Sequence, residues 1–280
     1  MKEFIKKILK SLGIYHPLQT SYRRLVQETT SVVWKCRYRQ YRGEGYECNF
    51  CHARYRRFVP EHPPADCRAA IENNNVVAGY GEQVYCPACL SKNRERLIKE
   101  VIARYLQPAR KNILHLSPEK HLHRYLRTMA TVTSVDLEPG FYRAIDPNIG
   151  YADATKLPFK NNEYDILIAN HVLEHIPQDQ QAMREFFRVL KPGGVAVLQV
   201  PLSLSLPTTI EDPFIQDPRR QAALYGQRDH VRIYSLNNYI ERLQNSGFRV
   251  RVIPPAELAI FERYAIQENE SAILAIKDPS

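Results

Sequence analysis

The spacing of apolar residues divides the chain into three regions. Apolar residues recur at helical spacing near the start of residues 1–35, with lysines opposite, which predicts a basic amphipathic helix followed by a second helical stretch. The apolar positions of the first helix are Ile5, Ile8, Leu9 and Leu12. Residues 36–92 show little periodicity, so they are expected to have a poor apolar core and to need a metal ion for stability. From residue 93 onward a regular alternation begins.

This alternation of helical patterns with short apolar runs predicts an α/β fold with a mainly parallel sheet across residues 93–280. The helices are expected at 93–106, 119–129, 179–194 and 235–248, and the strands at 111–117, 131–138, 164–169, 195–201, 249–254 and 271–278. The last two strands have no long helix between them, which predicts an antiparallel hairpin at the sheet edge. Ligands of such sheets bind at the carboxyl ends of the strands, so the residues just after each strand are the candidates for function.

The positive charge of the chain is concentrated near its start. The chain of 280 residues has a net charge of +9. Residues 1–60 hold 13 Lys and Arg against 4 Asp and Glu, whereas residues 61–280 hold 26 of each kind. A basic appendage suits an anionic partner such as nucleic acid, a membrane surface or a glycan phosphate, although a solvated basic face that aids solubility gives the same pattern. No apolar run reaches the ~20 residues of a membrane span, and the start does not resemble a signal peptide, so a soluble cytoplasmic protein is expected.

All six cysteines lie in the first third of the chain, and four of them form two C-x-x-C pairs. Cys48, Cys51, Cys86 and Cys89 are therefore predicted to bind one structural Zn²⁺ through four thiolates. The 34 residues between the pairs exceed the usual spacing, which predicts an insertion. Two unrelated reduced pairs or a redox pair are the alternatives. The competing ligands would be Cys67, His52 and His62, and free thiols are expected at Cys36 and Cys67.

Acidic residues at the strand ends indicate a nucleoside site. Asp136 ends the second strand, where a carboxylate can accept both hydroxyls of a ribose. Asp153 follows a further short strand, the third in chain order and ahead of the one at 164–169, and could bind an adenine amino group. His171 comes just after the fourth strand and begins an H-x-x-E-H pattern, which is also that of a class of zinc proteases. A protease would place both histidines inside a helix, whereas here His171 follows a strand directly, so Glu174 and His175 are expected to brace the turn.

Residues 152–201 resemble the core of a class I S-adenosylmethionine-dependent methyltransferase of the type 11 family. The matching motifs are D-A-x-x-L-P-F at 153–159, Y-D-I-L-I at 164–168, H-V-L-E-H-I-P at 171–177 and R-V-L-K-P-G-G at 188–194. Residues 86–97 and 226–235 are similar to a bacterial subgroup with an N-terminal cysteine-rich module. The resemblance implies a Rossmann-like seven-stranded sheet that binds S-adenosylmethionine. It also implies cofactor contacts at Asp136, Asp153, Ala154, Asn170 and His171.

The first strand departs from the family pattern. The family has an acidic residue and a glycine-rich loop there, whereas this chain has the sequence ILHLSPEK. His115 stands in place of the acid, and Ser117 and Glu119 stand in place of two glycines, which normally let the backbone approach the cofactor closely. We expect Glu119 to compensate by pairing with the ammonium group of the cofactor. The alternative is a degenerate domain without activity, acting as a zinc-dependent interaction protein.

The sequence therefore predicts a methyltransferase of three parts: a basic helical arm at 1–35, a zinc-binding module at 36–92 and a catalytic domain at 93–280. His171 and His230 are the candidate general bases, because imidazole titrates near neutral pH. The polar stretch at 226–234 is expected either to face the acceptor or to be a salt-bridged loop. Its candidate residues are Arg228, Asp229, His230 and Arg232.

The acceptor is expected to be a glycan or other small molecule, methylated at oxygen. No N-P-P-Y follows the fourth strand and no Pro-Cys nucleophile is present, which argues against base methylation of the usual kinds. RNA is the alternative acceptor, since arginines and aromatic residues interleave at 34–58. In the first case the basic arm at 1–35 is expected to contact an anionic membrane surface peripherally.

Overall fold

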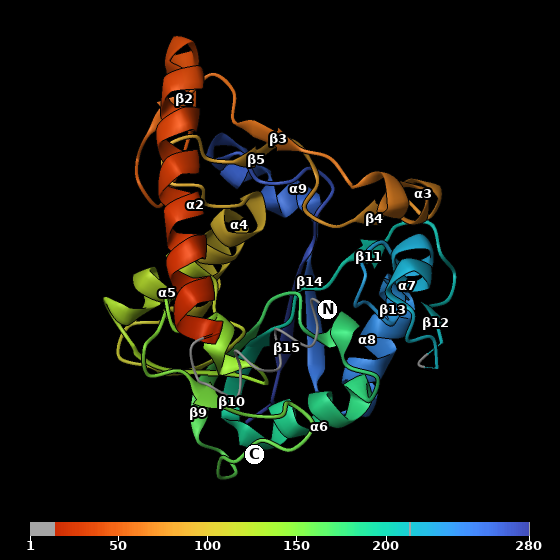
Figure 1. Cartoon of the computed structure of the whole chain (residues 1–280). Coiled ribbons are helices and arrows are strands. Elements are labelled where there is room, and N and C mark those ends of the chain that lie inside the picture. The colour runs from red at the N-terminus through yellow and green to blue at the C-terminus, as the bar shows by residue number, and fades with distance from the viewer. Residues whose placement is uncertain (1–14, 213, 280) are drawn as a thin grey trace.

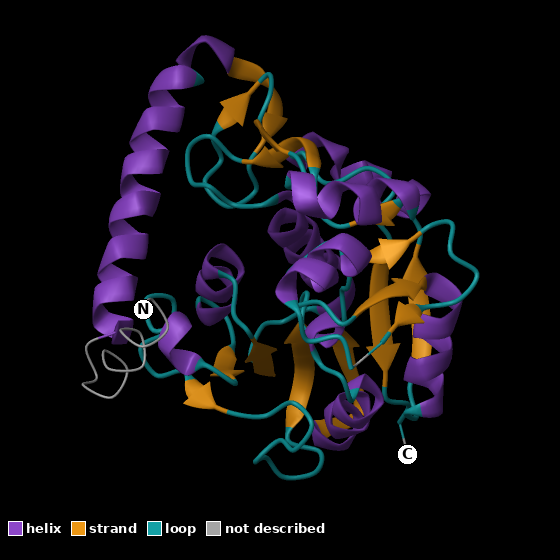
Figure 2. Cartoon of the chain, turned by 45° about the vertical axis from the view of Figure 1, so that its right-hand side comes forward, coloured by secondary structure: helices purple, strands orange, loops and turns teal. Residues whose placement is uncertain are grey.

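The computed structural model describes residues 15–212 and 214–279. The first predicted helix, with its apolar positions at residues 5–12, lies outside the described residues. The second helical stretch is α2 (Tyr15–Arg37), which runs along one side of the molecule (Figures 1 and 2). None of the helices in the described ranges is long and apolar enough to cross a bilayer.

Helix α2 has one side turned to the protein and one side turned to solvent. Its carboxyl-terminal half is attached to the N-terminal module, where the Ser31 hydroxyl donates to the Ala88 carbonyl over 3.0 Å. The rings of Trp34 and Tyr85 lie 5.3 Å apart. A stripe of apolar side chains on the other side is exposed: Leu18, Tyr22, Leu25, Val26 and Val33. Exposed apolar stripes of this size mark contact surfaces more often than isolated exposed apolar residues do.

The N-terminal module is built from short strands around an aromatic core. After η1 (Arg39–Tyr41), its elements are β1 (Arg42–Glu47), β2 (Arg54–Tyr55), β3 (Val59–Glu61), α3 (Ala65–Asn73), β4 (Val76–Val77) and β5 (Gly81–Tyr85). Strand β1 pairs with β2 and strand β3 with β5, both antiparallel. Tyr38, Tyr55 and Phe58 are buried between them beside Cys48 and Cys86. The module thus has more core than the lack of periodicity predicted, because aromatic residues supply it.

The seven-stranded sheet predicted from the resemblance is confirmed. Its order is β14-β15-β10-β9-β6-β7-β8. The strands are β6 (Asn112–Leu116), β7 (Thr131–Asp136), β8 (Gly150–Tyr151), β9 (Tyr164–Ala169), β10 (Leu190–Val197), β14 (Arg249–Ile253) and β15 (Ala272–Ile276). Strands β6 to β10 are parallel, and β15 is antiparallel to both of its neighbours. The last two strands do pair antiparallel, although β15 is inserted between β14 and β10, so only β14 forms the edge.

Helices cover both faces of the sheet. One face packs against α4 (Asn93–Val101), π-helix η2 (Ile102–Leu106), α5 (Lys120–Arg127), α9 (Pro255–Leu258) and η5 (Ala259–Tyr264). The other face packs against α6 (Asp179–Val189) and α8 (Leu236–Asn245). Side chains alternate along each strand, so Ile113 faces the first layer and Leu114 the second. Helix α6 ends at Val189, five residues before the predicted stop, because β10 begins at Leu190.

A small second sheet joins the N-terminal module to the carboxyl-terminal half of the chain. Its order is β12-β13-β11-β4, with β11 (Leu202–Ser203), β12 (Ile210–Glu211) and β13 (Arg232–Ser235). Strand β4 of the module pairs antiparallel with β11. The adjoining helix α7 (Pro218–Tyr225) packs against α3. The module therefore shares a sheet and a helix contact with the rest of the protein.

Arg96 makes a third joint, at the start of the larger domain. Its guanidinium is fully buried and donates to the carbonyls of Ser91, Val84 and Gln83 in the module. It also donates to the carbonyls of Tyr264 and Ala265, 168 and 169 residues later in the chain. A guanidinium has five N–H donors in a fixed plane, which suits a hub of several carbonyls. One side chain thus holds the module, α4 and η5 together.

Candidate active site

A cleft of about 1300 Å³ opens at the carboxyl ends of β6, β7 and β9. Five of the predicted cofactor-binding residues line it, namely Ser117, Asp136, Asp153, Ala154 and His171, and so does the predicted acceptor-side residue Asp229. The polar side of α2 forms its roof with Arg24, Gln27, Glu28, Ser31 and Lys35. Lys120, at the first turn of α5, donates to the Gln27 side chain over 3.1 Å and so connects the floor to the roof. The parallel topology explains the convergence, since all these strand ends lie at one edge of the sheet.

Ser117 and Asp136 are held together. The Ser117 backbone has φ of 48°, in the left-handed region that glycine adopts easily. Serine therefore takes the conformation that the family's glycine would provide. Its hydroxyl donates to Asp136 Oδ2 over 2.6 Å, and the Glu138 amide donates to Asp136 Oδ1 over 2.6 Å. These bonds fix the orientation of the Asp136 carboxylate at the edge of the cleft.

Asp153 and Ala154 lie on the neighbouring wall. The Asp153 carboxylate accepts hydrogen bonds from the amide and the hydroxyl of Thr155, at 2.8 and 2.7 Å. This side-chain turn fixes the carboxylate after β8. Ala154 is buried but contributes to the lining of the cleft. Asp136 and Asp153 are thus brought to one cleft, as the sequence predicted.

His115, Glu119 and Asn170 are not among the cleft-lining side chains. His115 is fully buried on the opposite face of β6, with its ring 6.2 Å from that of His123, and burial lowers its pKa to about 3. Its placement corrects the expectation of a cofactor contact, because strand alternation turns this position away. Glu119 accepts from Arg94 Nε over 2.9 Å and from Asn170 Nδ2 over 2.6 Å. The carboxylate expected to bind the cofactor's ammonium group therefore already has an internal cation, Arg94, which the sequence did not indicate.

His171 lies at the cleft in a strained backbone conformation. Its φ is 55°, and its amide donates to the Gln199 carbonyl over 2.8 Å. Such strain is concentrated at functional sites. Its Nδ1 lies 3.2 Å from Glu174 Oε1. Burial, followed by the charge of Arg94, lowers the pKa of His171. The His171 ring is therefore a neutral imidazole beside the cleft.

Glu174 is a buried carboxylate among three histidines. Its side chain is 1% exposed. Burial raises its pKa, but the contact with His171 and the nearby His175 and His230 outweigh burial and hold the pKa at about 2. The short helix η4 (Leu173–His175) carries it, and α6 begins at Asp179, as expected from the sequence. Glu174 is therefore ionised inside the protein.

The four predicted acceptor-side residues separate into three environments. Asp229 lines the cleft and His230 is buried behind it, with its ring 4.7 Å from that of His175. Arg228 is exposed and forms an ion pair with Asp66 of α3 at 2.7 Å. Arg232 is buried in an ion-pair network away from the cleft. The structure therefore keeps Asp229 at the cleft and does not place the two arginines there.

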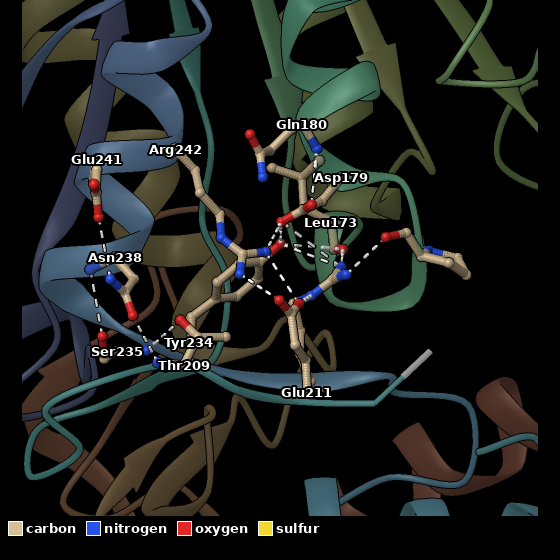
Figure 3. Close-up of polar contacts among 12 residues, drawn as sticks. Leu173, Asp179, Gln180, Thr209, Glu211, Tyr234, Ser235, Asn238, Glu241 and Arg242 are labelled. Carbon is tan, nitrogen blue, oxygen red and sulfur yellow. Dashed lines mark hydrogen bonds and ion pairs between the residues drawn. The ribbon is translucent and has the colours of Figure 1, made fainter. Parts of the chain in front are cut away.

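The network around Arg232 supports the loop that carries His171 and Glu174, and Figure 3 shows its members Asp179, Glu211, Tyr234 and Arg242. Arg232 donates to Glu211 over 2.8 Å and to the carbonyls of Leu173 and Pro177 over 3.0 and 2.9 Å. Asp179 accepts from Tyr234 and Arg242, both over 2.7 Å, and Glu211 also pairs with Arg242. Sequence reasoning missed Asp179, Glu211, Tyr234 and Arg242, since their contacts join distant segments. Arg232 positions the loop and does not face an acceptor.

The four predicted cysteine ligands converge. The Sγ atoms of Cys48, Cys51, Cys86 and Cys89 lie within 4.8 Å of one another, with contacts of 3.6 and 3.7 Å. Tetrahedral zinc with Zn–S bonds of about 2.3 Å needs S–S separations of about 3.8 Å, so the donor set fits. The Ser91 hydroxyl lies 3.2 Å from Cys48 Sγ, as an outer-shell group would. None of Cys67, His52 and His62 belongs to this cluster, and Cys36 is exposed. Cys89 and Leu90 line the cleft, so the module borders the cofactor region.

A buried acid below His171 predicts a pH-dependent stability. Glu270 accepts from Gln199 over 3.0 Å, and burial raises its pKa to about 7, against a smaller lowering by Gln199 and Arg94. A raised pKa means that the folded state favours the protonated form. The stability that protonated Glu270 gives the folded state is fully present below the unfolded-state pKa of 4.5 and is lost as pH rises through the folded-state pKa of about 7. Wild-type protein is expected to lose about 3 kcal/mol of unfolding free energy across this window.

Glu270→Gln is expected to remove that loss, because glutamine stays neutral. Urea unfolding at about pH 5 and about pH 8 measures the difference. Glu268→Gln, an exposed neighbour, is the control and is expected to keep the wild-type pH dependence. Equal pH dependence in Glu270→Gln and the wild type would show that Glu270 is not the titrating group.

A model of a known protein family matches part of this chain. Residues 118–198 match the family model described as a methyltransferase domain. An uncharacterised methyltransferase of Mycobacteroides abscessus is 35% identical over 78 residues, which are 27% of this chain and 30% of that protein. A demethylmenaquinone methyltransferase of Staphylococcus saprophyticus is 41% identical over 59 residues, 21% of this chain and 24% of that protein. The chain thus spans less than a third of the length of these relatives.

Solved structures are similar to this chain only at low identity and low TM-score. A chain from a complex between the Haloferax volcanii Trm112 methyltransferase activator and a methyltransferase is 16% identical, with a TM-score of 0.48, covering 67% of this chain and 92% of that chain. An S-adenosylmethionine dependent methyltransferase from Mesorhizobium loti is 16% identical, with a TM-score of 0.45, covering 64% of this chain and 96% of that chain. The family match falls on β7–β10 and the helices α5 and α6, and it includes Asp136, Asp153 and His171 of the cleft but not β6. Residues 118–198 therefore match a methyltransferase domain, and they lie within the seven-stranded Rossmann-like sheet.

Proposed function

We propose that this protein is an S-adenosylmethionine-dependent methyltransferase. The observation that carries the proposal is the meeting of Asp136, Asp153 and His171 at one cleft with the strained Ser117 backbone. Asp136 would hold the ribose hydroxyls, and Asp153 with Ala154 would hold the adenine. Lys120, at the cleft floor, supplies a cation for the carboxylate of the cofactor. The cofactor supplies an activated methyl group when bound, so the protein's main task is to position the acceptor.

The size of the cleft leaves room for an acceptor beside the cofactor. Sites for a single small molecule have volumes of about 300–1000 Å³, and this cleft is larger at about 1300 Å³. The end lined by His171, His175 and Asp229 is the polar end beyond the cofactor-binding acids. His171 is neutral, and Glu174 fixes its Nδ1 side. We assign His171 the role of general base toward an acceptor hydroxyl.

A glycan or other small molecule remains the preferred acceptor class. The RNA alternative depended on aromatic side chains that could stack with bases. Tyr38, Tyr55 and Phe58 are instead buried in the core of the module, and Tyr46 packs against it. Burial of these rings weakens the stacking argument for RNA, which then rests on the basic charge and on the partly buried Trp34, Tyr41 and Phe50.

The proposed function also includes one structural zinc ion and a peripheral contact with a membrane surface. Four convergent thiolates beside Ser91 support one zinc ion per chain. The exposed apolar stripe on α2 supports peripheral contact with an anionic membrane surface, because an apolar stripe on a basic helix favours interfacial binding. Leu18, Tyr22, Leu25 and Val33 of the stripe do not line the cleft, so such contact would leave the polar roof of the cleft free.

Asp136→Ala is expected to weaken the binding of S-adenosylhomocysteine by about 1.5–3 kcal/mol for each ribose hydrogen bond lost. Isothermal calorimetry of the full-length protein measures the change. Glu262→Gln, an exposed acid outside the cleft, should leave the affinity unchanged. Absence of binding by the wild type at millimolar ligand would refute the proposed activity in favour of the inactive alternative.

The acceptor class is tested by methyl transfer from labelled cofactor into fractionated cell extract. Label in polar material that resists RNase is expected. Label that disappears with RNase would overturn the glycan or small-molecule assignment in favour of RNA.

A further inference from the structure

The hydrogen bonds around Glu174 do not account for the burial of its carboxylate. Apart from His171, whose Nδ1 lies 3.2 Å from Oε1, the described residues give its two oxygens no hydrogen-bond donor, although the side chain is 1% exposed. An ionised carboxylate in such a place needs a cation or several donors. Two histidines face it from different elements: His175 follows it in η4, and His230 comes from the segment between α7 and β13.

Each histidine has one ring nitrogen engaged on its outer side. His175 Nδ1 lies 3.3 Å from the Asp229 carbonyl and 3.4 Å from its carboxylate. His230 Nδ1 lies 3.3 Å from the Tyr225 carbonyl. A carbonyl can only accept, so each Nδ1 carries a hydrogen, and a neutral ring then keeps a lone pair on Nε2. His230 Nε2 lies 3.9 Å from Glu174 Oε1.

This arrangement is typical of metal ligands. Histidines that bind metals donate their other N–H to a carbonyl or a carboxylate, which fixes the tautomer. One ligand atom from each of Glu174, His175 and His230 lies within 4.8 Å of the other two. The side chain of His230 is 7% exposed and that of His175 is 30% exposed, so the group is closed behind and open in front.

We propose that Glu174, His175 and His230 bind a divalent transition-metal ion, separate from the four-cysteine site. Two imidazoles and one carboxylate suit ions such as Zn²⁺ and Fe²⁺ and leave coordination positions open. His175 and Asp229 line the cleft, so the open side faces the region assigned to the acceptor. The open side of the metal site suits an acceptor molecule that binds the ion through an oxygen atom.

The alternative is a proton-sharing network in which a protonated His175 balances Glu174 without metal. The two cases differ in metal content. The full-length protein, saturated with Zn²⁺ and freed of excess ion, is expected to contain two ions per chain by elemental analysis. His230→Ala is expected to contain one, whereas His62→Ala, an exposed histidine paired with Glu82, should keep two.

Cobalt substitution distinguishes the two sites. Co²⁺ at the cysteines gives an intense thiolate charge-transfer band, and Co²⁺ at a site of nitrogen and oxygen ligands gives only weak ligand-field bands. The weak bands should be missing from His230→Ala. They should also be missing from Glu174→Gln, which keeps the shape of the side chain and serves as the test if the alanine variant does not fold. One ion per chain in the wild type, or weak bands that survive both substitutions, would overturn the proposal. Neither measurement needs cofactor or turnover, so its outcome is independent of the proposed methyl transfer.

Discussion

Cys86→Ser is expected to abolish zinc binding and to unfold the N-terminal module. Structural zinc contributes about 10–16 kcal/mol of apparent binding free energy, which is folding free energy when the unfolded chain has no formed site. The seven-stranded sheet should persist, since its two cores do not include the cysteines. Cofactor affinity should nevertheless fall, because Cys89, Leu90 and the attached α2 border the cleft.

Zinc content, thermal unfolding and S-adenosylhomocysteine affinity measure these effects in one preparation. Cys36→Ser is the matched control, because Cys36 is an exposed thiol outside the cluster. It should keep the zinc, the unfolding temperature and the affinity of the wild type. A wild-type protein whose stability does not change in a strong chelator would contradict the structural role of zinc.

Arg232→Ala is expected to lower the free energy of unfolding by about 3–5 kcal/mol. The arginine is 2% exposed at its side chain and lies 3.8 Å from Asp179 Oδ2 and 2.8 Å from Glu211 Oε2. Its removal leaves buried negative charge with less compensation, which costs more than the loss of an exposed pair. The carbonyls of Leu173 and Pro177 also lose their donor, so the loop with His171 should loosen and methyl transfer should fall.

Arg228→Ala is the control for this prediction. Its side chain is 68% exposed and its pair with Asp66 is open to solvent, so stability should be nearly unchanged. Urea unfolding of both variants measures the contrast. If the two arginine variants lost similar amounts of stability, the structural role of the Arg232 network would be wrong.

The sequence predicted the sheet and the position of two acids at strand ends because the evidence for them is local. Apolar runs define the strands, and Asp136 and Asp153 follow strand ends within a few residues. Helix α8 was also predicted from local signals, since the Ser235 hydroxyl accepts from the Asn238 amide at its start. Features of this kind depend on neighbours in the chain, so periodicity and capping residues report them.

The rest of the site depends on contacts between distant segments. Arg94 reaches Glu119 across 25 residues, and Arg242 reaches Asp179 across 63. His115 looked like a replacement for an acid, but the alternation along β6 turns it to the opposite face. Ser117 looked like the loss of a glycine, whereas the backbone adopts the glycine conformation with serine in place. Pairings and backbone angles of this kind are set by tertiary packing, which a single sequence does not reveal.

Arg96 has a consequence for the order in which the protein folds during synthesis. All four cysteines of the zinc site have been made and released once residue 89 has left the ribosome, so zinc can bind early in synthesis. The carbonyls of Tyr264 and Ala265, which Arg96 also needs, emerge about 170 residues later. Until then the buried guanidinium lacks two of its acceptors, and the joint between module and sheet stays open. The first part of the chain to acquire its metal is therefore among the last to become fixed in place.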